Sequence, residues 1–260
     1  DRLKFESALR RAVKRNEFRL VYQPIVRLED RTVAGFEALL RWEHPRRGVI
    51  PPSEFIPIAE SCGLIVQLGL FAMQQAADDL AGWQKFAGEN PISVSVNLSN
   101  RQLLRRDLVS DVRSVLARSN LKPRCLRLEL TESLVMDNPE QSAHVLNKLK
   151  QLGIGLSLDD FGTGYSSLAY LTRFPFDTIK IDKSFVDDSN PKKNVLLRSM
   201  VNMAHDLGLS VVAEGVPDEE SALLLRQIGC EYVQSFAFGS PMTGENAVRL
   251  LKEQFATAQA

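Results

Sequence analysis

Six stretches of the chain that read as β-strands end in a carboxylate, an amide or a lysine. The side chains at these ends are Glu37, Asn97, Glu129, Asp159 with Asp160, Lys180 with Asp182, and Glu214. A parallel barrel gathers the carboxyl ends of its strands on one face, so residues far apart in the sequence can converge there. Burying several carboxylates together is costly unless cations neutralise them, and oxygen ligands suit Mg²⁺ or Mn²⁺. The pattern therefore predicts a metal-dependent enzyme.

Length and charge agree with this fold class. The chain has 260 residues, and α/β barrels typically have about 250, so we expect a single domain over residues 1–260. Lys plus Arg equals Asp plus Glu at 32 each. This balance gives no reason to expect a nucleic-acid polymer as a partner. No apolar run approaches the roughly 20 residues that span a bilayer, and the N-terminus does not follow the order of a signal peptide. We therefore expect no membrane segment and a cytoplasmic location.

The order of elements predicts a modified barrel. Strands are expected near residues 18–25, 32–41, 92–97, 125–130, 154–160, 177–182, 210–214 and 232–236. Helical patterns fall near 53–60, 64–86, 100–118, 139–151, 165–172, 192–207, 218–228 and 244–255. Only about six residues join the first two strands, too few for a parallel crossover. The predicted fold class is α/β, a (β/α)8 TIM-like barrel with an antiparallel first strand pair.

Side-chain alternation indicates which residues point inward. In the strand near 125–130, Leu126, Leu128 and Leu130 lie on the face opposite Arg127 and Glu129. Alternate residues of a strand face opposite sides. The strands near 92–97 and 177–182 show the same alternation. If their aliphatic faces meet the surrounding helices, Asn97, Glu129, Lys180 and Asp182 point into the barrel. A polar barrel core without catalytic function is the alternative.

Seven motifs together resemble a known family. They are Tyr22-Gln23-Pro24-Ile25, Phe36-Glu37-Ala38-Leu39-Leu40-Arg41-Trp42, Val96-Asn97-Leu98-Ser99, Glu129-Leu130-Thr131-Glu132-Ser133, the segment from Asp159 to Ser167, Lys180-Ile181-Asp182 and Ala213-Glu214-Gly215-Val216. Each is weak evidence alone, but in this order they resemble the EAL-domain phosphodiesterases specific for cyclic di-GMP. The resemblance covers essentially the whole chain.

The resemblance implies a two-metal site. Glu37, Asn97, Glu129 and Asp159 resemble the ligands of a first Mg²⁺ or Mn²⁺ ion. Asp159 would bridge to a second ion, completed by Asp160 and by Glu214, directly or through water. Such an ion pair activates a water for in-line attack at phosphorus. The implied reaction is hydrolysis of cyclic di-GMP to linear pGpG.

The resemblance also implies roles for residues around the metals. Lys180 would orient the attacking hydroxide or offset charge on the phosphate, and Glu214 would take a proton from the attacking water. The division between these two stays open, as does a purely structural salt bridge for Lys180. Arg41 would anchor phosphate through its planar fork. Gln23, Asp182 and Gln234 are the other candidates for the nucleotide or its waters, and Glu132 would brace the loop after Asp160.

The sequence departs from the family pattern at two places. Pro217 stands where a further glutamate commonly follows Val216, and Asp218 is a possible substitute. Gln234-Ser235-Phe236 replaces the more familiar Gln-Gly-Tyr. The main alternative function is a catalytically silent cyclic di-GMP receptor, and a phosphodiesterase with another substrate is a further one. From the family we expect a homodimer. The chain begins abruptly in a helical pattern, so we also expect it to be a module of a longer signalling protein, fused to regulatory or sensory domains.

Overall fold

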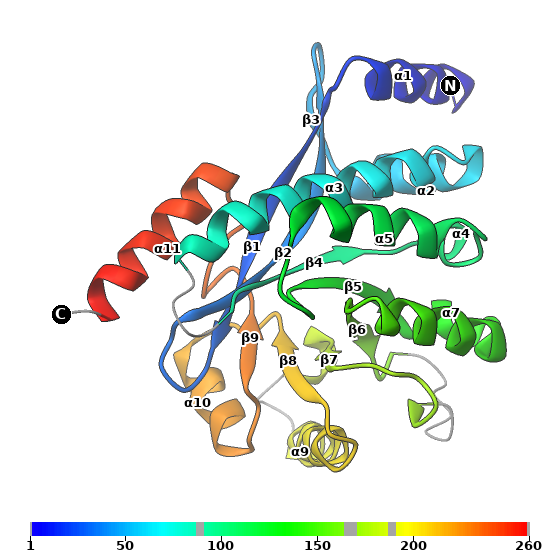
Figure 1. The fold of residues 1–260 in the computed structure, drawn as a ribbon. Helices are drawn as coiled ribbons and strands as arrows, with labels where there is room; N and C mark the ends of the chain where they lie inside the picture. Colours follow the sequence, from blue (N-terminus) through cyan, green and yellow to red (C-terminus); the bar gives the residue numbers. More distant parts are fainter. Residues whose placement is uncertain (1, 87–90, 164–170, 187–190, 259–260) are drawn as a thin grey trace.

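The computed structural model describes residues 2–86, 91–163, 171–186 and 191–258. Eight strands close into a barrel in the order β1, β9, β8, β7, β6, β5, β4, β2, and β2 pairs back onto β1 (Figure 1). They are β1 (Phe18–Arg27), β2 (Val33–His44), β4 (Ser93–Asn97), β5 (Leu126–Thr131), β6 (Gly155–Phe161), β7 (Thr178–Ile181), β8 (Ser210–Glu214) and β9 (Tyr232–Gln234). A short strand, β3 (Gly48–Ile50), extends the sheet beyond β2.

Strand direction confirms the predicted fold class. β1 runs antiparallel to both of its neighbours, β2 and β9. The other barrel strands pair in parallel from β2 through β4, β5, β6, β7 and β8 to β9. Parallel pairing brings the carboxyl ends of seven strands to one rim of the barrel.

Helices cover the outside of the barrel. They are α1 (Arg2–Lys14), α2 (Pro52–Cys62), α3 (Ile65–Trp83), α4 (Asn100–Leu103), α5 (Leu108–Ser119), α6 (Glu132–Met136), α7 (Pro139–Gln151), α9 (Pro191–Asp206), α10 (Glu219–Gln227) and α11 (Gly244–Ala258), with short 3-10 turns η1 (Gln84–Phe86) and η2 (Lys183–Phe185). In the described part of the chain, no single helix is long and apolar enough to cross a membrane. The α2 and α3 segment passes that test only as a pair, which is bent by 120° at its break.

The start and end of α7 follow the expected local chemistry. The Asn138 side chain accepts a hydrogen bond from the Gln141 backbone N–H at 3.3 Å, and Pro139 occupies the first turn. Such a cap satisfies one of the unpaired N–H groups of a helix start. Gly153 follows the helix with a φ of +89°, a conformation that glycine adopts without steric cost.

The structure corrects one expected element and adds two that were not expected. The helix expected over 100–118 is two helices, because the chain turns between Leu103 and Leu108, where Arg105 contacts Asp107 and Asp111. β3 and α6 lie in segments where no element was predicted. The helix expected over 165–172 falls mostly outside the described residues.

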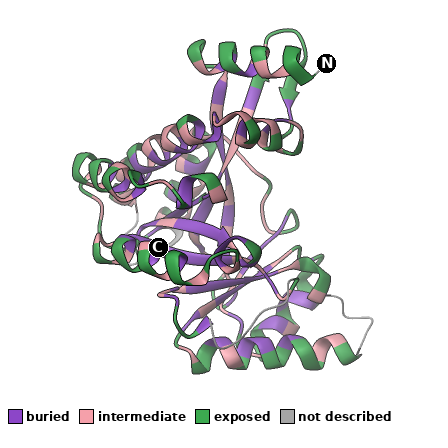
Figure 2. Cartoon of the chain, turned by 90° about the vertical axis from the view of Figure 1, so that its right-hand side faces the viewer, coloured by how far each residue is buried: buried purple, intermediate pink, exposed green. Residues whose placement is uncertain are grey.

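The outward faces of the strands form the core with the helices. Figure 2 shows buried residues concentrated on the strands and on the helix faces that cover them. The aliphatic side chains predicted to face outward are at most 3% exposed: Ile92, Val94, Val96, Leu126, Leu128, Leu130, Ile179 and Ile181. Burial of this apolar layer is the main driving force for the fold. It leaves the alternate, polar residues to fill the barrel interior.

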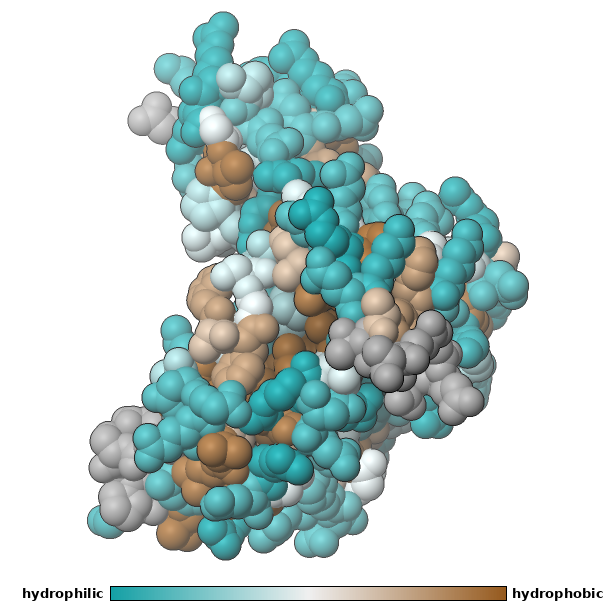
Figure 3. All heavy atoms as spheres, turned by 90° about the vertical axis from the view of Figure 1, so that its left-hand side faces the viewer, coloured by the Kyte–Doolittle hydropathy of each residue, from teal (hydrophilic) through white to brown (hydrophobic). Residues whose placement is uncertain are grey.

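The upper end of β1 and β2 projects beyond the rim. Ala38 of β2 is level with Val96 of β4, and β4 ends one residue later. β2 continues to His44, where it pairs with β3. A second apolar cluster, around Trp42, Phe55 and Leu9, packs α1 and α2 against this projection. Figure 1 shows α1 and β3 at the top of the molecule, and the face in Figure 3 is indented below this part.

Candidate active site

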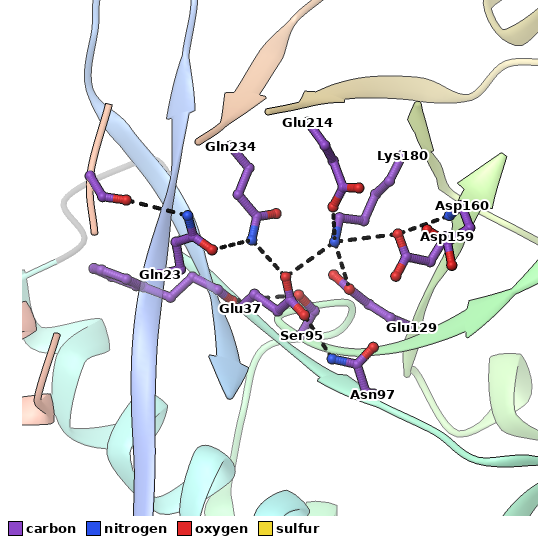
Figure 4. A network of polar contacts seen from close by, with 12 residues as sticks. Gln23, Glu37, Ser95, Asn97, Glu129, Asp159, Asp160, Lys180, Glu214 and Gln234 are labelled. Carbon is purple, nitrogen blue, oxygen red and sulfur yellow. Dashed lines mark hydrogen bonds and ion pairs between the residues drawn. The ribbon is translucent and has the colours of Figure 1, made fainter. Parts of the chain in front are cut away.

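Polar side chains from eight strands meet at the rim of the barrel (Figure 4). Strand register places Asn97 beside Glu129, Thr131 beside Asp159 and Glu214 beside Gln234. Gln23 lies opposite Glu37 in the antiparallel pair. The inward direction predicted for Asn97, Glu129 and Lys180 therefore matches the geometry, whereas Asp182, predicted with them, caps η2.

Lys180 is the centre of this cluster. Its side chain is 1% exposed, and Nζ lies 2.8 Å from Glu214, 2.9 Å from Glu129, 3.2 Å from Glu37 and 3.5 Å from Asp159. Burial by itself lowers the pKa of Lys180, but the surrounding carboxylates, Glu129 first, hold that pKa well above its usual value. The carboxylates around Lys180 therefore favour its charged form.

The carboxylates around Lys180 differ in their affinity for protons. Burial and the charge of Glu37 raise the pKa of Glu129 to about 8. Burial also raises the pKa of Glu214 to about 7, although Lys180 opposes this. For Glu37, burial is outweighed by Lys180 and by the side-chain amides of Gln234 and Asn97, so its pKa falls. Groups with such separated pKa values are common at functional sites.

Three carboxylates of the cluster lie close enough together to hold a metal ion. Oxygens of Asp159, Asp160 and Glu214 lie within 4.8 Å of one another. Asp160 has a φ of +54°, and its backbone N–H donates to Asp159 Oδ1 at 3.0 Å. Aspartate tolerates this left-handed conformation better than most residues do. The three residues are those predicted for a second ion, and an all-oxygen donor set suits Mg²⁺ or Mn²⁺.

The residues predicted for a first ion surround the same lysine. Asn97 Nδ2 donates to Glu37 Oε1 at 2.7 Å. Glu37, Glu129 and Asp159 each contact Lys180 Nζ. The structure therefore brings all four predicted ligands together.

Gln234 and Gln23 support Glu37 from the adjoining strands. Gln234 Nε2 donates to Glu37 Oε2 at 2.6 Å and lies 3.3 Å from Gln23 Oε1. Gln23 Nε2 lies 3.4 Å from the Gly239 carbonyl oxygen. Gln234 Oε1 is buried and has no hydrogen-bond partner among the described residues. That oxygen can accept a hydrogen bond from a water or a ligand beside Glu37.

Glu132 contacts the loop that follows the paired aspartates. Its carboxylate is buried on α6, directly after β5, and Oε2 accepts a hydrogen bond from the Gly162 backbone N–H at 3.0 Å. Thr131 caps α6 through the Leu134 N–H. This local geometry is the one required for the predicted bracing role.

Two predicted substrate residues lie outside the network around Lys180. Asp182 caps η2, with Oδ1 accepting the Ser184 N–H at 2.9 Å. Its charge nevertheless reaches the site, because burial, Asp159 and then Asp182 raise the pKa of Asp160. Arg41 lies further along β2, with Nη1 donating to the Leu40 carbonyl at 3.0 Å.

The two departures from the family pattern have local structural consequences. Asp218 is the N-cap of α10, where Oδ1 accepts from the N–H and the hydroxyl of Ser221 at 2.9 and 2.8 Å. The Asp218 carboxylate therefore caps the N-terminus of α10. The Ser235 side chain is buried, and Oγ has no hydrogen-bond partner among the described residues.

Ser95 is a site residue that was not among the sequence candidates. It is 2% exposed, its Oγ donates to the Phe36 carbonyl at 3.5 Å, and its hydroxyl lowers the pKa of Glu129 against the larger effect of burial. Ser95 lies two residues before Asn97 on the same inward face of β4. Strand alternation was the signal that indicated its direction, but serine alone carries no chemical signature.

These features define a TIM-like barrel protein with a candidate metal centre at the carboxyl ends of its strands. The EAL domain model matches residues 6–241, and the chain belongs to the EAL domain family. This confirms the resemblance found in the motifs.

Several relatives and solved structures share this fold and sequence. The cyclic di-GMP phosphodiesterase NbdA of Pseudomonas aeruginosa is 41% identical over 242 residues, covering 92% of this chain and 31% of NbdA. A structure described as the PaMucR phosphodiesterase in complex with c-di-GMP has a TM-score of 0.87 and 40% identity, covering 93% of this chain and 98% of that one. The EAL enzyme Bd1971, with cAMP and cyclic di-GMP bound, has a TM-score of 0.90 and 35% identity, covering 97% of this chain and 69% of that one.

The chain spans about a third of the length of the curated relatives it matches, for example 34%, 36% and 28%. The bifunctional protein MucR of Pseudomonas aeruginosa is likewise covered over 35% of its length. The matched relatives are therefore larger than the domain described here.

Proposed function

We propose that this chain hydrolyses cyclic di-GMP to linear pGpG with two divalent cations, Mg²⁺ or Mn²⁺. The observation that carries the proposal is the complete acidic set around Lys180, in which Asp159, Asp160 and Glu214 lie within 4.8 Å of one another. The relatives named for cyclic di-GMP support the choice of substrate.

Each residue around the metal centre would have its own role in binding metal or substrate. Glu37, Asn97, Glu129 and Asp159 would hold one ion, and Asp159 and Asp160 would hold the other, which Glu214 would contact through a water. When bound, the ions supply Lewis-acid activation of water and of the phosphate. Lys180 would keep the carboxylates in place and offset charge on the phosphate. Gln234 would fix the orientation of Glu37 through its hydrogen bond.

The reaction needs a group that accepts a proton from the attacking water. A general base is most effective when its pKa is near the working pH. Burial raises the pKa of Glu214 to about 7, and this carboxylate is partly exposed at the rim. We assign the role of accepting the proton from the attacking water to Glu214. The water oxygen would bond to phosphorus, and the bond from phosphorus to the ribose 3′ oxygen would break, which leaves the 5′-phosphate of pGpG.

The test is direct identification of the product. Purified chain is incubated with cyclic di-GMP and Mg²⁺, and pGpG is followed by chromatography, with parallel samples in chelator and with Glu37→Ala. The proposal predicts pGpG only with metal and with Glu37. Tight binding of cyclic di-GMP without turnover in either Mg²⁺ or Mn²⁺ would instead indicate a receptor. Turnover of another cyclic nucleotide in place of cyclic di-GMP would indicate a different phosphodiesterase.

A further inference from the structure

Arg19 and Arg41 face each other across the first strand pair. They are partners in the antiparallel ladder, as are Gln23 and Glu37 four residues away. Side chains alternate across a strand, so Arg19 shares a face of β1 with Gln23, and Arg41 shares a face of β2 with Glu37. Glu37 and Gln23 point into the site (Figure 4). Arg19 is therefore on the site side of the sheet.

The arginine pair lies above the metal centre. Ala38 is level with Val96, and β4 ends at Asn97, so Arg41 is beyond the rim of the neighbouring strand. Four residues separate Glu37 from Arg41, a distance of roughly 13 Å along an extended strand. A ligand group bound at the arginine pair would therefore be a separate part of the ligand from the group bound at the metal centre.

The positive charge of this pair is only partly compensated. Like charges directly opposite each other in a ladder repel. Arg19 Nε lies 2.7 Å from Glu43 Oε1, which provides one counter-charge. Among the described residues, no carboxylate forms an ion pair with Arg41, and its hydrogen bond goes to the Leu40 carbonyl. Burial and the neighbouring Arg19 charge lower the pKa of Arg41, whereas Glu37 opposes this shift.

Arg19 also has an unused donor. Nε is buried and makes no hydrogen bond in the described structure, although Glu43 is close enough for an ion pair. The Nε–H of Arg19 is therefore not directed at the Glu43 carboxylate, although the two groups are close. The rest of the side chain is accessible, at 41% exposure. A buried donor without an acceptor is uncommon in folded proteins and can mark a place where a ligand binds.

We propose that Arg19 is a second phosphate-binding residue, which together with Arg41 holds the phosphodiester of cyclic di-GMP that is not cleaved. The proposal rests on the proposed function. A cyclic dinucleotide carries two phosphodiesters, so an anion remains for the arginine pair when the other is at the metal centre. Guanidinium groups offer paired donors that fit phosphate oxygens. A phosphate between the two arginines would cancel their repulsion and would compete with Glu43 for Arg19.

The experiment measures kcat and KM for cyclic di-GMP, with binding by calorimetry, in Arg19→Met, Arg19→Lys, Arg41→Met and the double variant. Losing one charge-assisted contact to a phosphate should raise KM and Kd about tenfold for Arg19→Met, with kcat within about twofold of wild type. Arg19→Lys should recover part of the affinity. Both arginines would hold the same phosphate. The free-energy changes from KM and Kd in the double variant should therefore not equal the sum of those in Arg19→Met and Arg41→Met.

Two matched variants separate ligand binding from structure. Glu43→Gln removes the ion pair and keeps Arg19, so KM should stay unchanged or fall. Arg10→Met removes an exposed arginine that pairs with Glu6 on α1, and should leave KM unchanged. A KM for Arg19→Met within twofold of wild type, or an equal rise for Glu43→Gln, would overturn the assignment of Arg19. Failure of the wild type to bind cyclic di-GMP would overturn the proposed function and this assignment together.

Discussion

At the residue scale, the charge balance of the site depends on Lys180. Its ammonium group contacts four carboxylates from four different strands and has almost no exposure to solvent. A buried ion pair contributes little net stability compared with an apolar core, but removing one partner leaves an uncompensated charge. Lys180 should therefore be essential to the metal-free fold as well as to the reaction.

The variant Lys180→Met tests this electrostatic role. Without divalent metal, its unfolding free energy should be about 3–5 kcal/mol lower than that of the wild type at pH 8, measured by urea denaturation. Mn²⁺ should restore part of the loss, because a ligand that binds the native state stabilises it. Exposed Lys148→Met is the control and should change little. Equal stability of the two variants would contradict the role given to Lys180.

Metal binding should depend strongly on pH between about 6 and 8. The pKa of Glu129 is raised to about 8 and that of Glu214 to about 7, so in the metal-free protein both carboxyls hold protons below these values. Metal ligands must be deprotonated, so binding releases protons and affinity rises with pH. Calorimetry in buffers of different ionisation enthalpy should show more proton release at pH 6.5 than at pH 8.5. The same proton release at both pH values would count against the raised pKa values.

The direction of the site residues was predictable from sequence, but their contacts were not. Alternation of polar and aliphatic residues placed Asn97, Glu129 and Lys180 inside the barrel. The hydrogen bond from Gln234 to Glu37 joins β9 to β2 across β1, and such a contact depends on the curvature of the closed barrel. Arg19 was missed because its role depends on the register of the antiparallel pair.

At the scale of elements, the unit formed by β5, α6 and the start of the loop after β6 connects folding to the site. Thr131 ends β5 and caps α6, and Glu132 then reaches Gly162. Gly162 has a φ of +92°, and a Cβ there would lie 2.8 Å from the Met200 side chain. Glu132 therefore holds a tightly packed turn directly after Asp159 and Asp160.

The variant Glu132→Ala should disturb the reaction more than the fold. Loss of the acceptor leaves the Gly162 N–H unpaired, and removal of such outer residues of a metal site typically costs about 10- to 100-fold in metal affinity or activity. Glu132→Gln keeps an acceptor oxygen and should be milder. Circular dichroism reports the fold, and Mn²⁺ calorimetry with kcat reports the site. Wild-type kcat and Mn²⁺ affinity in Glu132→Ala would contradict the bracing role.

Local signals also explain which elements sequence could and could not predict. Asn138, Pro139 and Gly153 fixed α7 because caps and turns need particular residue types. The break between α4 and α5 was missed because Arg105 and its two aspartates are ordinary helix-surface residues. α6 has only five residues, too few to give a periodic pattern.

At the scale of the whole molecule, the chain corresponds to one part of its longer relatives. It spans about a third of its relatives, 31% of NbdA and 35% of MucR. We propose that it forms a homodimer through the loop after β6, which lies mostly outside the described residues, and the neighbouring helices. On α9, Val195 and Leu196 are 68% and 47% exposed and offer an apolar contact surface.

Light scattering tests the dimer. The wild-type chain should show about twice the 29.1 kDa mass of one chain, and Val195→Asp should shift it toward the monomer, because burying a charge in an apolar interface is unfavourable. Leu223→Asp on α10, another exposed leucine at 47%, is the matched control. A monomeric wild type at concentrations of about 100 μM would contradict the dimer.

We propose that the acidic cluster around Lys180 is a divalent-metal centre that cleaves cyclic di-GMP. The most direct measurement is single-turnover hydrolysis titrated with Mn²⁺, with wild type and Asp159→Asn side by side and nucleotide binding measured in parallel. We expect turnover to require Mn²⁺, and Asp159→Asn to lose turnover while remaining folded. Near wild-type turnover in Asp159→Asn, or full activity in chelator, would contradict the claim.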